Sequence, residues 1–239
     1  MRKIVSMVAV VAAAVTSPLQ AEEAAAGKLW TGEVALGYLQ SAGNTSTTNF
    51  NGKSKAIRDG QQWRNTYKLE GANESADDIR TAENYFAALK TDYKLDEKSY
   101  LFNLLEYTDD RFSGYNYEYS VTFGYGRVLI ENASHKLSAD LGLGYRFSEF
   151  DAGYTDEDAV ARVGGLYKWT ISESTVFDEE VSSEIGEEKH TTKSLTRLQM
   201  KVNGNLWGFV AYEIKRTSEV PAGVKNSDRK TSVGLNYAF

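Results

Sequence analysis

The sequence has no cysteine and only two histidines and two prolines among 239 residues. Without cysteine there is no disulfide scaffold, no thiolate metal site and no cysteine nucleophile. Neither His135 nor His190 is in phase with a serine or aspartate for hydrolysis, and we find no zinc-ligand spacing, phosphate loop or nucleotide fingerprint. The mature chain also lacks a run of about 20 apolar residues, which a membrane helix needs. The sequence therefore predicts no enzyme, no cofactor, no metal site and no helical membrane protein.

The first 21 residues indicate an export signal rather than part of the fold. A basic start, Met1-Arg2-Lys3, precedes an apolar run over residues 4–15, and the segment ends in Ala21 before Glu22. This pattern predicts a cleaved signal peptide over residues 1–21, followed by a short periplasmic segment over residues 22–29. Cleavage leaves 25 basic and 33 acidic residues, so nucleic acid is not an expected partner.

Alternation with a period of two dominates the remaining chain. In residues 137–147, Leu141, Leu143 and Tyr145 alternate with polar or small residues such as Asp140 and Arg146, so one face of the strand is apolar. The mean hydropathy of −0.45 is compatible with a transmembrane β-barrel, because polar lumen-facing residues lower the average. Twelve such segments are predicted, at residues 30–41, 46–58, 61–72, 82–95, 98–108, 117–130, 135–148, 159–170, 175–186, 191–202, 206–216 and 229–239. The prediction is an all-β chain, folded as a transmembrane antiparallel up-and-down β-barrel of about 12 strands over residues 30–239.

The predicted connections alternate between tight turns and longer loops, as in outer-membrane barrels. The tight turns are at Asp59-Gly60, Asp96-Glu97, Asn132-Ala133, Ser172-Glu173 and Asn203-Gly204, and the longer loops cover residues 73–81, 109–116, 149–158, 187–190 and 217–228. The connection at residues 42–45 is the short exception. A two-residue turn at Asp59-Gly60 pairs Arg58 with Gln61, and this register places Lys55 opposite Arg64.

Aromatic residues gather near the strand ends that carry the tight turns. All four tryptophans lie there, and we expect an interface girdle of Trp30, Trp63, Trp169 and Trp207. The alternative is that they are core tryptophans of a soluble β-sandwich. The last strand carries one apolar stripe that ends in Tyr237 and Phe239. This ending resembles the C-terminal assembly signal of bacterial outer-membrane proteins, which implies the barrel-assembly machinery as a partner during biogenesis.

Three further segments carry a resemblance to a family. They are Thr31-Gly32-Glu33-Val34-Ala35-Leu36-Gly37-Tyr38 with Ser41-Ala42-Gly43-Asn44-Thr45, then Asp109-Asp110-Arg111-Phe112-Ser113-Gly114-Tyr115, and Phe123-Gly124-Tyr125-Gly126. Together they resemble the salt-induced outer membrane proteins (YdiY-like) of Gram-negative bacteria. The resemblance implies a barrel in the outer membrane and expression linked to salt, and it implies no reaction.

If the apolar stripes face lipid, the opposite stripes face the lumen. This assignment places fourteen basic and eight acidic residues inside the barrel. The lumen-facing candidates are Glu33, Lys53, Lys55, Arg64, Lys68, Glu70, Lys90, Asp92, Asp140, Arg146, Arg162, Arg197 and Glu213. Two interpretations stay open: a small passive pore that favours small anions, and a salt-bridged plug that stabilises the barrel and the envelope. A soluble, periplasmic, lipocalin-like binding barrel is the rival, and it would turn the apolar stripes inward.

The longer loops are acidic, most clearly residues 149–158. They could share divalent cations with lipopolysaccharide, or be a solvated surface. Outer-membrane lipid, lipopolysaccharide and small ions are therefore the expected partners. Two features fit the pattern poorly. Glu179 falls on an apolar stripe, which predicts either a bulge or a misplaced strand, and the phase of residues 100–107 is ambiguous.

Overall fold

The computed structural model describes residues 29–41, 47–77, 79–111, 113–220 and 224–239. The predicted signal peptide, the first seven residues of the predicted periplasmic segment and the predicted short connection at residues 42–45 lie outside the described residues. No helix in the described part of the chain is both long and apolar enough to cross a membrane.

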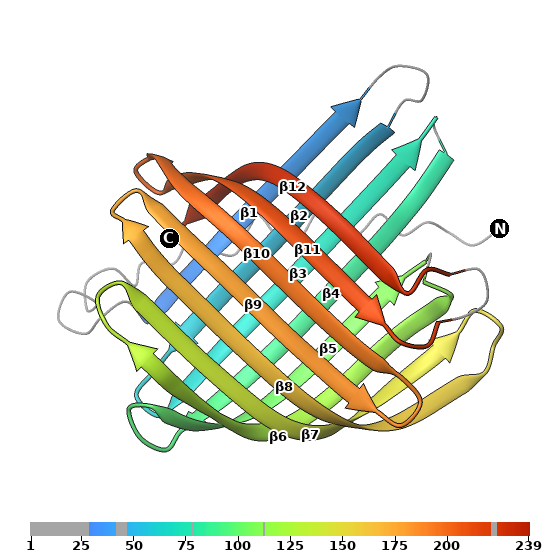
Figure 1. Cartoon of the computed structure of the whole chain (residues 1–239), viewed down its shortest axis with the longest axis horizontal. Coiled ribbons are helices and arrows are strands. Elements are labelled where there is room, and N and C mark those ends of the chain that lie inside the picture. The colour runs from blue at the N-terminus through green and yellow to red at the C-terminus, as the bar shows by residue number, and fades with distance from the viewer. Residues whose placement is uncertain (1–28, 42–46, 78, 112, 221–223) are drawn as a thin grey trace, which may run out of the picture.

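The described chain forms twelve strands, and each corresponds to one predicted segment to within four residues at either end. They are β1 (Trp30–Ser41), β2 (Thr47–Asp59), β3 (Trp63–Ala76), β4 (Ile79–Lys94), β5 (Ser99–Asp110), β6 (Tyr115–Glu131), β7 (His135–Phe150), β8 (Thr155–Ser172), β9 (Thr175–Gly186), β10 (His190–Asn203), β11 (Leu206–Thr217) and β12 (Ser227–Ala238). Every strand pairs antiparallel with its neighbours in sequence, and β1 pairs with β12 to close the sheet. Figure 1 shows the resulting barrel. The predicted twelve-stranded up-and-down barrel is confirmed.

The strands β1 and β12 meet at the seam that closes the barrel. Their paired residues run from Glu33 opposite Ala238 to Gly37 opposite Gly234, and Gly32 exchanges two backbone hydrogen bonds with Phe239, at 3.0 and 2.9 Å. A Cβ atom on Gly32 would lie 2.6 Å from Cζ of Phe239. Only glycine at position 32 leaves room for the aromatic ring that ends the seam.

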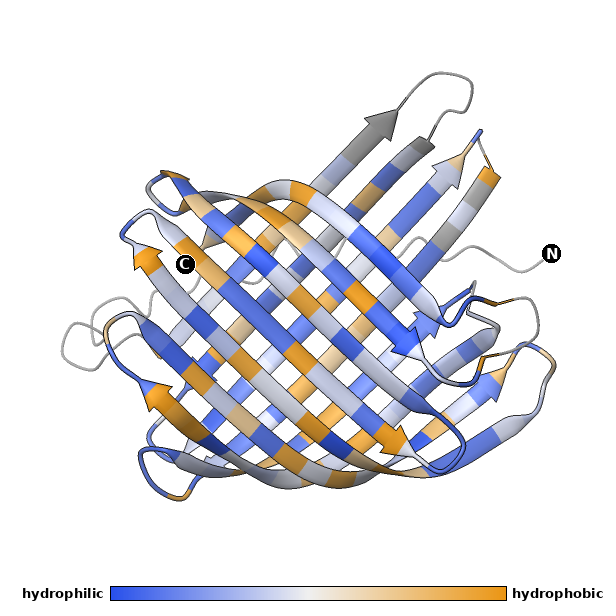
Figure 2. Cartoon of the chain, viewed as in Figure 1, coloured by the Kyte–Doolittle hydropathy of each residue, from blue (hydrophilic) through white to orange (hydrophobic). Residues whose placement is uncertain are grey.

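The two faces of the barrel wall differ in chemistry because side chains alternate along each strand. On the outside, Leu143 is 72% exposed and Phe123 is 63% exposed, whereas Arg146 on the inside is 4% exposed. Figure 2 shows this alternation of hydrophobic and hydrophilic positions along the strands. Since the apolar stripes point outward, the inward-facing arrangement of a soluble lipocalin-like barrel is wrong for this chain.

The ambiguous segment at residues 100–107 follows the same rule. Its outward residues are Leu101, Leu105 and Tyr107, while Tyr100, Phe102 and Leu104 are buried inside. Tyr100 and Phe102 lie beneath the ammonium of Lys90, whose Nζ is 5.1 and 4.6 Å from the two ring centroids. The sequence leaves the inward and outward faces of residues 100–107 ambiguous because aromatic side chains occur on both. Those in the lumen are stabilised by a cation that lies over the face of the ring.

The hairpin at Gly60 has a different register from the predicted one. Asp59 continues β2 and pairs with Arg64, so Lys55 lies opposite Lys68 instead of Arg64. The turn is wider because Gly60 N–H donates to the carbonyl of Trp63 at 2.9 Å, and Lys94 Nζ binds Asp59 Oδ1 at 2.5 Å. The partner of each β2 residue therefore lies four residues further along β3 than predicted. An even shift leaves the inward and outward faces unchanged.

Most of the predicted long loops are short, and this part of the prediction is wrong. Residues 77–78 join β3 to β4, residues 111–114 join β5 to β6, and residues 151–154 join β7 to β8. Polar strand ends continue to pair above the apolar band, as Glu149 does with Thr155. The nine-residue connection between β11 and β12, residues 218–226, is long as predicted.

Glu179 faces outward without any irregularity in β9. The register around Glu179 is continuous with both neighbouring strands, and the one shift against β8 lies at Thr170–Ser172, opposite the start of β9. The structure therefore has neither the bulge at Glu179 nor the misplaced strand that the sequence predicts. The hydroxyl groups of Ser194 and Thr196 donate hydrogen bonds to its carboxylate at 2.9 and 2.6 Å. Two donors on the adjacent strand therefore compensate in part for placing a charge on the outer face.

Candidate functional site

One ion pair joins opposite walls of the barrel. Lys68 on β3 lies with Nζ 2.5 Å from Oε1 of Glu180 on β9. In a closed ring of twelve strands, β3 and β9 are six strands apart on either path, which places them diametrically opposite. The two side chains meet across the lumen and occupy its middle.

Further ion pairs connect strands that are three apart in the ring. Lys53 on β2 contacts Glu213 on β11 at 2.7 Å, and Lys90 on β4 contacts Asp140 on β7 at 2.7 Å. Arg197 on β10 binds Glu33 on β1, with Nη1 3.0 Å from Oε1. Because none of these three pairs joins neighbouring strands, the contacts cross the lumen instead of lying along one wall.

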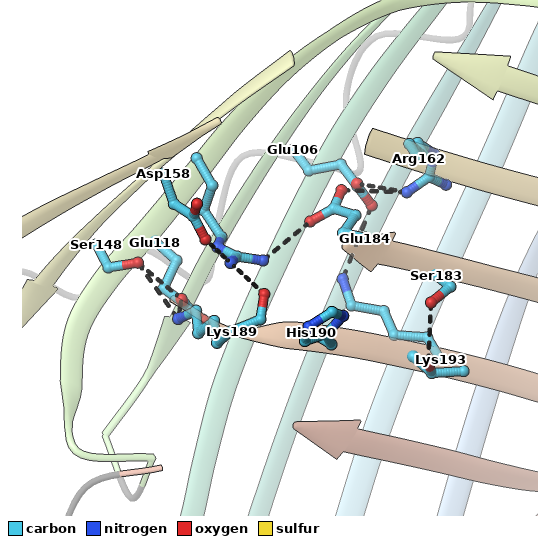
Figure 3. Close-up of polar contacts among 12 residues, drawn as sticks. Glu106, Glu118, Ser148, Asp158, Arg162, Ser183, Glu184, Lys189, His190 and Lys193 are labelled. Carbon is cyan, nitrogen blue, oxygen red and sulfur yellow. Dashed lines mark hydrogen bonds and ion pairs between the residues drawn. The ribbon is translucent and has the colours of Figure 1, made fainter. Parts of the chain in front are cut away.

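A denser group of charges lies toward the rim that carries the β9–β10 connection (Figure 3). Nη1 of Arg162 is 3.2 Å from carboxylate oxygens of both Glu106 and Glu184. Nη2 of Arg146 is 2.7 Å from Oδ2 of Asp158, and its Nη1 is 3.8 Å from Glu184. We call this group, with the residues that adjoin it, the inner cluster; its members are Glu106, Glu118, Arg146, Asp158, Arg162, Glu184, Lys189, Lys193 and Lys215.

The β9–β10 connection, residues 187–189, folds into the barrel mouth. Lys189 is 4% exposed; its ammonium binds Glu118 and lies 3.3 Å from the hydroxyl of Ser148, as Figure 3 shows. Its carbonyl accepts a hydrogen bond from Nη2 of Arg146 at 2.9 Å. Burial lowers the pKa of the Lys189 ammonium, although the neighbouring Glu118 opposes this effect. Lys189 therefore ties this connection, which we call the strap, to β6 and β7 at the mouth of the barrel.

The predicted lumen residues lie on the inward face of the strands, and most of them contact one another. Arg64 binds Asp92 at 2.7 Å, and Lys53 also binds Glu70 at 3.0 Å. Lys55 pairs in the sheet with Glu33 on one side and Lys68 on the other, and no described ion pair includes it. The remaining candidates are in the pairs given above; they are Lys90, Asp140, Arg146, Arg162, Arg197 and Glu213.

Sequence reasoning missed five members of the inner cluster. Glu106 lies in the segment of ambiguous phase, and Glu184 follows Glu179, where the phase was in doubt. The sequence places Asp158 and Lys189 in predicted acidic loops, yet both are buried, at 3% and 4% exposed. The fifth is Lys193. Strand parity could have identified Glu184 and Lys193, but the inward path of the strap has no sequence signal.

The tryptophan girdle is only partly as predicted. Trp30, Trp63 and Trp169 face outward and are 44%, 48% and 40% exposed. Trp30 stacks on Tyr67 with ring centroids 6.1 Å apart, and Trp63 contacts Tyr93 at 4.9 Å.

Trp207 does not belong to the girdle, so that assignment is wrong. It lies on the face of β11 that carries buried Phe209 and Ala211, and the ammonium of Lys201 is 5.9 Å from its ring centroid. Strand alternation places Leu206 on the outward face of β11 with Val210 and Tyr212, which are 45% and 41% exposed. The two assembly-signal residues, Tyr237 and Phe239, face outward and are 52% and 45% exposed.

The chemistry available in the lumen is electrostatic. Within the described residues, no group of three or more histidine, aspartate and glutamate side chains is arranged to hold a metal ion. His135 faces outward, where Nδ1 is 2.9 Å from the hydroxyl of Tyr167 and the ring stacks on Trp169. The inner cluster can hold charges in place and exclude or bind small ions, since its carboxylates are all paired with basic groups whereas some of its basic donors are not.

Comparison of the fold with solved structures agrees with this architecture. An outer membrane channel from Pseudomonas putida F1 matches with a TM-score of 0.51 and 11% identity, over 88% of this chain and 95% of that one. The KdgM porin matches with a TM-score of 0.47 and 12% identity, over 87% and 99% of the two chains. At these identities the likeness concerns the barrel fold alone.

Sequence comparison gives the family. The uncharacterized protein YdiY of Escherichia coli (strain K12) is 27% identical over 219 residues, which cover 91% of this chain and 86% of that protein. The family model described as protein of unknown function, DUF481, matches residues 34–239. Both matches confirm the resemblance seen in the sequence motifs, and this membrane β-barrel belongs to the DUF481 family.

Proposed function

We propose that this protein is a closed barrel of the Gram-negative outer membrane that stabilises the envelope and carries no steady ion current at rest. The observation that carries the proposal is the contact of Lys68 with Glu180, which joins opposite walls of the lumen. Barrels of eight strands are filled by side chains and those of 16–18 strands are open. In a barrel of twelve strands, crossing ion pairs decide between these two states.

The pairs favour closure because they hold one another in place. Lys53 contacts both Glu70 and Glu213, and Arg197 contacts both Glu33 and Asp178. A permeating ion would have to displace these bonds, and each displaced charge would lose its partner in a partly desolvated lumen. At the mouth, the buried ammonium of Lys189 in the strap adds a further ion pair, with Glu118.

The outward apolar band and the fold support a location in the outer membrane. Lipid and lipopolysaccharide are then its surroundings, and the barrel-assembly machinery is its partner during biogenesis, as the ending at Tyr237 and Phe239 suggests. The proposed role is passive and involves no catalysis. A link to salt stress comes from the family resemblance, and loss of envelope integrity in a deletion strain at high salt would support it.

A small anion-selective pore is the second candidate. It is favoured by lumen lysines without a described ion pair, since none of the described ion pairs or hydrogen bonds includes the ammonium of Lys55, Lys215 or Lys230. Positive walls of this kind attract anions.

Planar-bilayer recording of the refolded barrel tests both candidates. The closed barrel gives no steady conductance, and the double change Lys68→Ala with Glu180→Ala opens it. The matched control removes an ion pair at the rim, Lys136 with Glu131, which are 2.7 Å apart and about half exposed, and leaves the barrel closed. Steady anion-selective current through the unchanged protein would overturn the proposal. The pore is then supported if Lys53→Gln, Lys55→Gln, Arg64→Gln and Lys68→Gln together weaken the anion preference.

A further inference from the structure

The charges of the inner cluster do not balance. Every carboxylate in it already has a basic partner: Asp158 has Arg146, Glu118 has Lys189, and Glu106 and Glu184 share Arg162. Its basic members outnumber its acidic members by one; the basic ones are Arg146, Arg162, Lys189, Lys193 and Lys215, and the acidic ones are Glu106, Glu118, Asp158 and Glu184. Among the described contacts, Lys215 is the basic member of the cluster that has no ion pair.

Lys215 also faces another lysine. Its cross-strand partners are Lys193 on β10 and the exposed Asp228 on β12. Lys193 and Lys215 line the same small cavity, and Asp228 does not. Like charges that lie directly opposite each other in a sheet repel. Lys193 is compensated only in part, since its Nζ is 3.8 Å from Glu106. A negative ion between the two lysines would remove this repulsion.

Arg146 supplies buried donors at the same cavity. Its side chain is 5% exposed, and neither Nε nor Nη1 donates a hydrogen bond within the protein. A buried charged donor without an acceptor is costly. Arg146 lines the cavity together with the hydroxyl-bearing residues Ser120 and Thr191, which are 6% and 9% exposed. The cavity thus combines cationic and hydroxyl donors, as anion sites do.

The size of the cavity limits the ligand. Its volume is about 30 Å³, which is room for one or two particles of the size of water. Glu106, Glu118 and Glu184 also line it, and they repel an anion of higher charge. Phosphate, sulfate and organic carboxylates are therefore too large or too highly charged.

We propose that the cavity between Arg146, Lys193 and Lys215 binds one small monovalent anion of the halide class. The anion neutralises the excess charge of the inner cluster and accepts hydrogen bonds from the unpaired donors of Arg146. The site does not depend on the proposed function, because a barrel that conducts could contain it as well. Bilayer recording tests closure, whereas the experiment below tests binding.

The experiment compares thermal unfolding of the refolded full-length barrel in detergent in sodium chloride, sodium bromide and sodium gluconate at equal ionic strength. Gluconate is too large for the cavity. Halide has little effect on Tm below the dissociation constant and raises it by about 3 °C for each tenfold rise in concentration above that constant. Lys215→Gln abolishes the halide dependence. The matched control Lys201→Gln, an exposed lysine on the inward face of β10, retains it.

A second measurement covers the case in which the Lys215 variant does not fold. Chloride-35 resonances broaden in the presence of the unchanged barrel, and added bromide reverses the broadening by competition. Equal Tm in chloride and gluconate, or the same halide dependence in the folded Lys215→Gln variant, would overturn the proposal. So would chloride broadening that bromide leaves unchanged.

Discussion

At the scale of single residues, Arg146 and Asp158 form a deeply buried ion pair, with side chains 5% and 2% exposed. Changing Asp158→Asn removes the carboxylate that Arg146 and the backbone N–H of Glu187 both contact. Because this leaves a buried guanidinium with only the more distant Glu184, at 3.8 Å, as a charge partner, we expect the free energy of unfolding to fall by about 3 kcal/mol. The measurement is the urea midpoint of the refolded barrel in lipid vesicles.

Asp151→Asn is the control for that change. Asp151 is exposed in the β7–β8 connection, and loss of an exposed carboxylate changes stability by less than about 1 kcal/mol. Equal urea midpoints for the Asp158 and Asp151 variants would show that the buried pair contributes nothing to stability.

Strand parity accounts for the part of the lumen that could be predicted residue by residue. It assigns Lys53, Arg64 and Glu213 to the inside because each alternates with outward residues in its own strand. It cannot give partners, since Lys53 meets Glu213 at a sequence separation of 160 residues. Such contacts depend on the closure and cross-section of the barrel, which no local pattern encodes.

At the scale of elements, the strap between β9 and β10 makes a prediction about proteolysis. Trypsin cleaves after exposed lysines, and Lys225 in the β11–β12 connection is exposed whereas Lys189 in the strap is buried. We expect limited trypsin digestion of the folded barrel to cleave after Lys225 and to spare Lys189. Mass spectrometry of the fragments distinguishes the two sites.

The variant Glu118→Gln tests why Lys189 is protected. It removes the carboxylate that binds the Lys189 ammonium, so we expect cleavage after Lys189 to increase at least severalfold relative to cleavage after Lys225. Cleavage at Lys189 in the unchanged barrel at the rate seen for Lys225 would contradict a strap that is packed into the mouth.

The bounds of a strand can be predicted from sequence where apolar alternation ends directly at residues that favour a turn. The bounds of β1 and β9 agree with the predicted segments at both ends, because apolar alternation stops at a turn signal. Hairpin ends such as those of β7 and β8 extend further than predicted, by two and four residues. Their polar residues pair through backbone hydrogen bonds, which are indifferent to side-chain hydropathy.

At the scale of the whole molecule, the barrel has an apolar outer surface and a charged lumen that ion pairs cross from wall to wall. This is the reverse of a soluble globular protein, where the apolar side chains form the core. The described chain has only small buried apolar groups, such as Ala35 with Phe209 and Ala211. Stability must therefore come from the closed hydrogen-bonded sheet, from the lumen pairs and from lipid around the outside.

The outward face of the barrel wall should tolerate arginine less at the bilayer midplane than near its surface. Leu143 is 72% exposed near the middle of β7, and Leu129 is 56% exposed near the β6–β7 turn. In a bilayer an arginine on the lipid face costs about 2–4 kcal/mol at the midplane and about 0–1 kcal/mol near the interface. We therefore expect Leu143→Arg to lower the free energy of unfolding in lipid vesicles far more than Leu129→Arg. In water the same two exposed positions would both tolerate arginine, so equal and small effects in vesicles would mean that lipid does not cover β7.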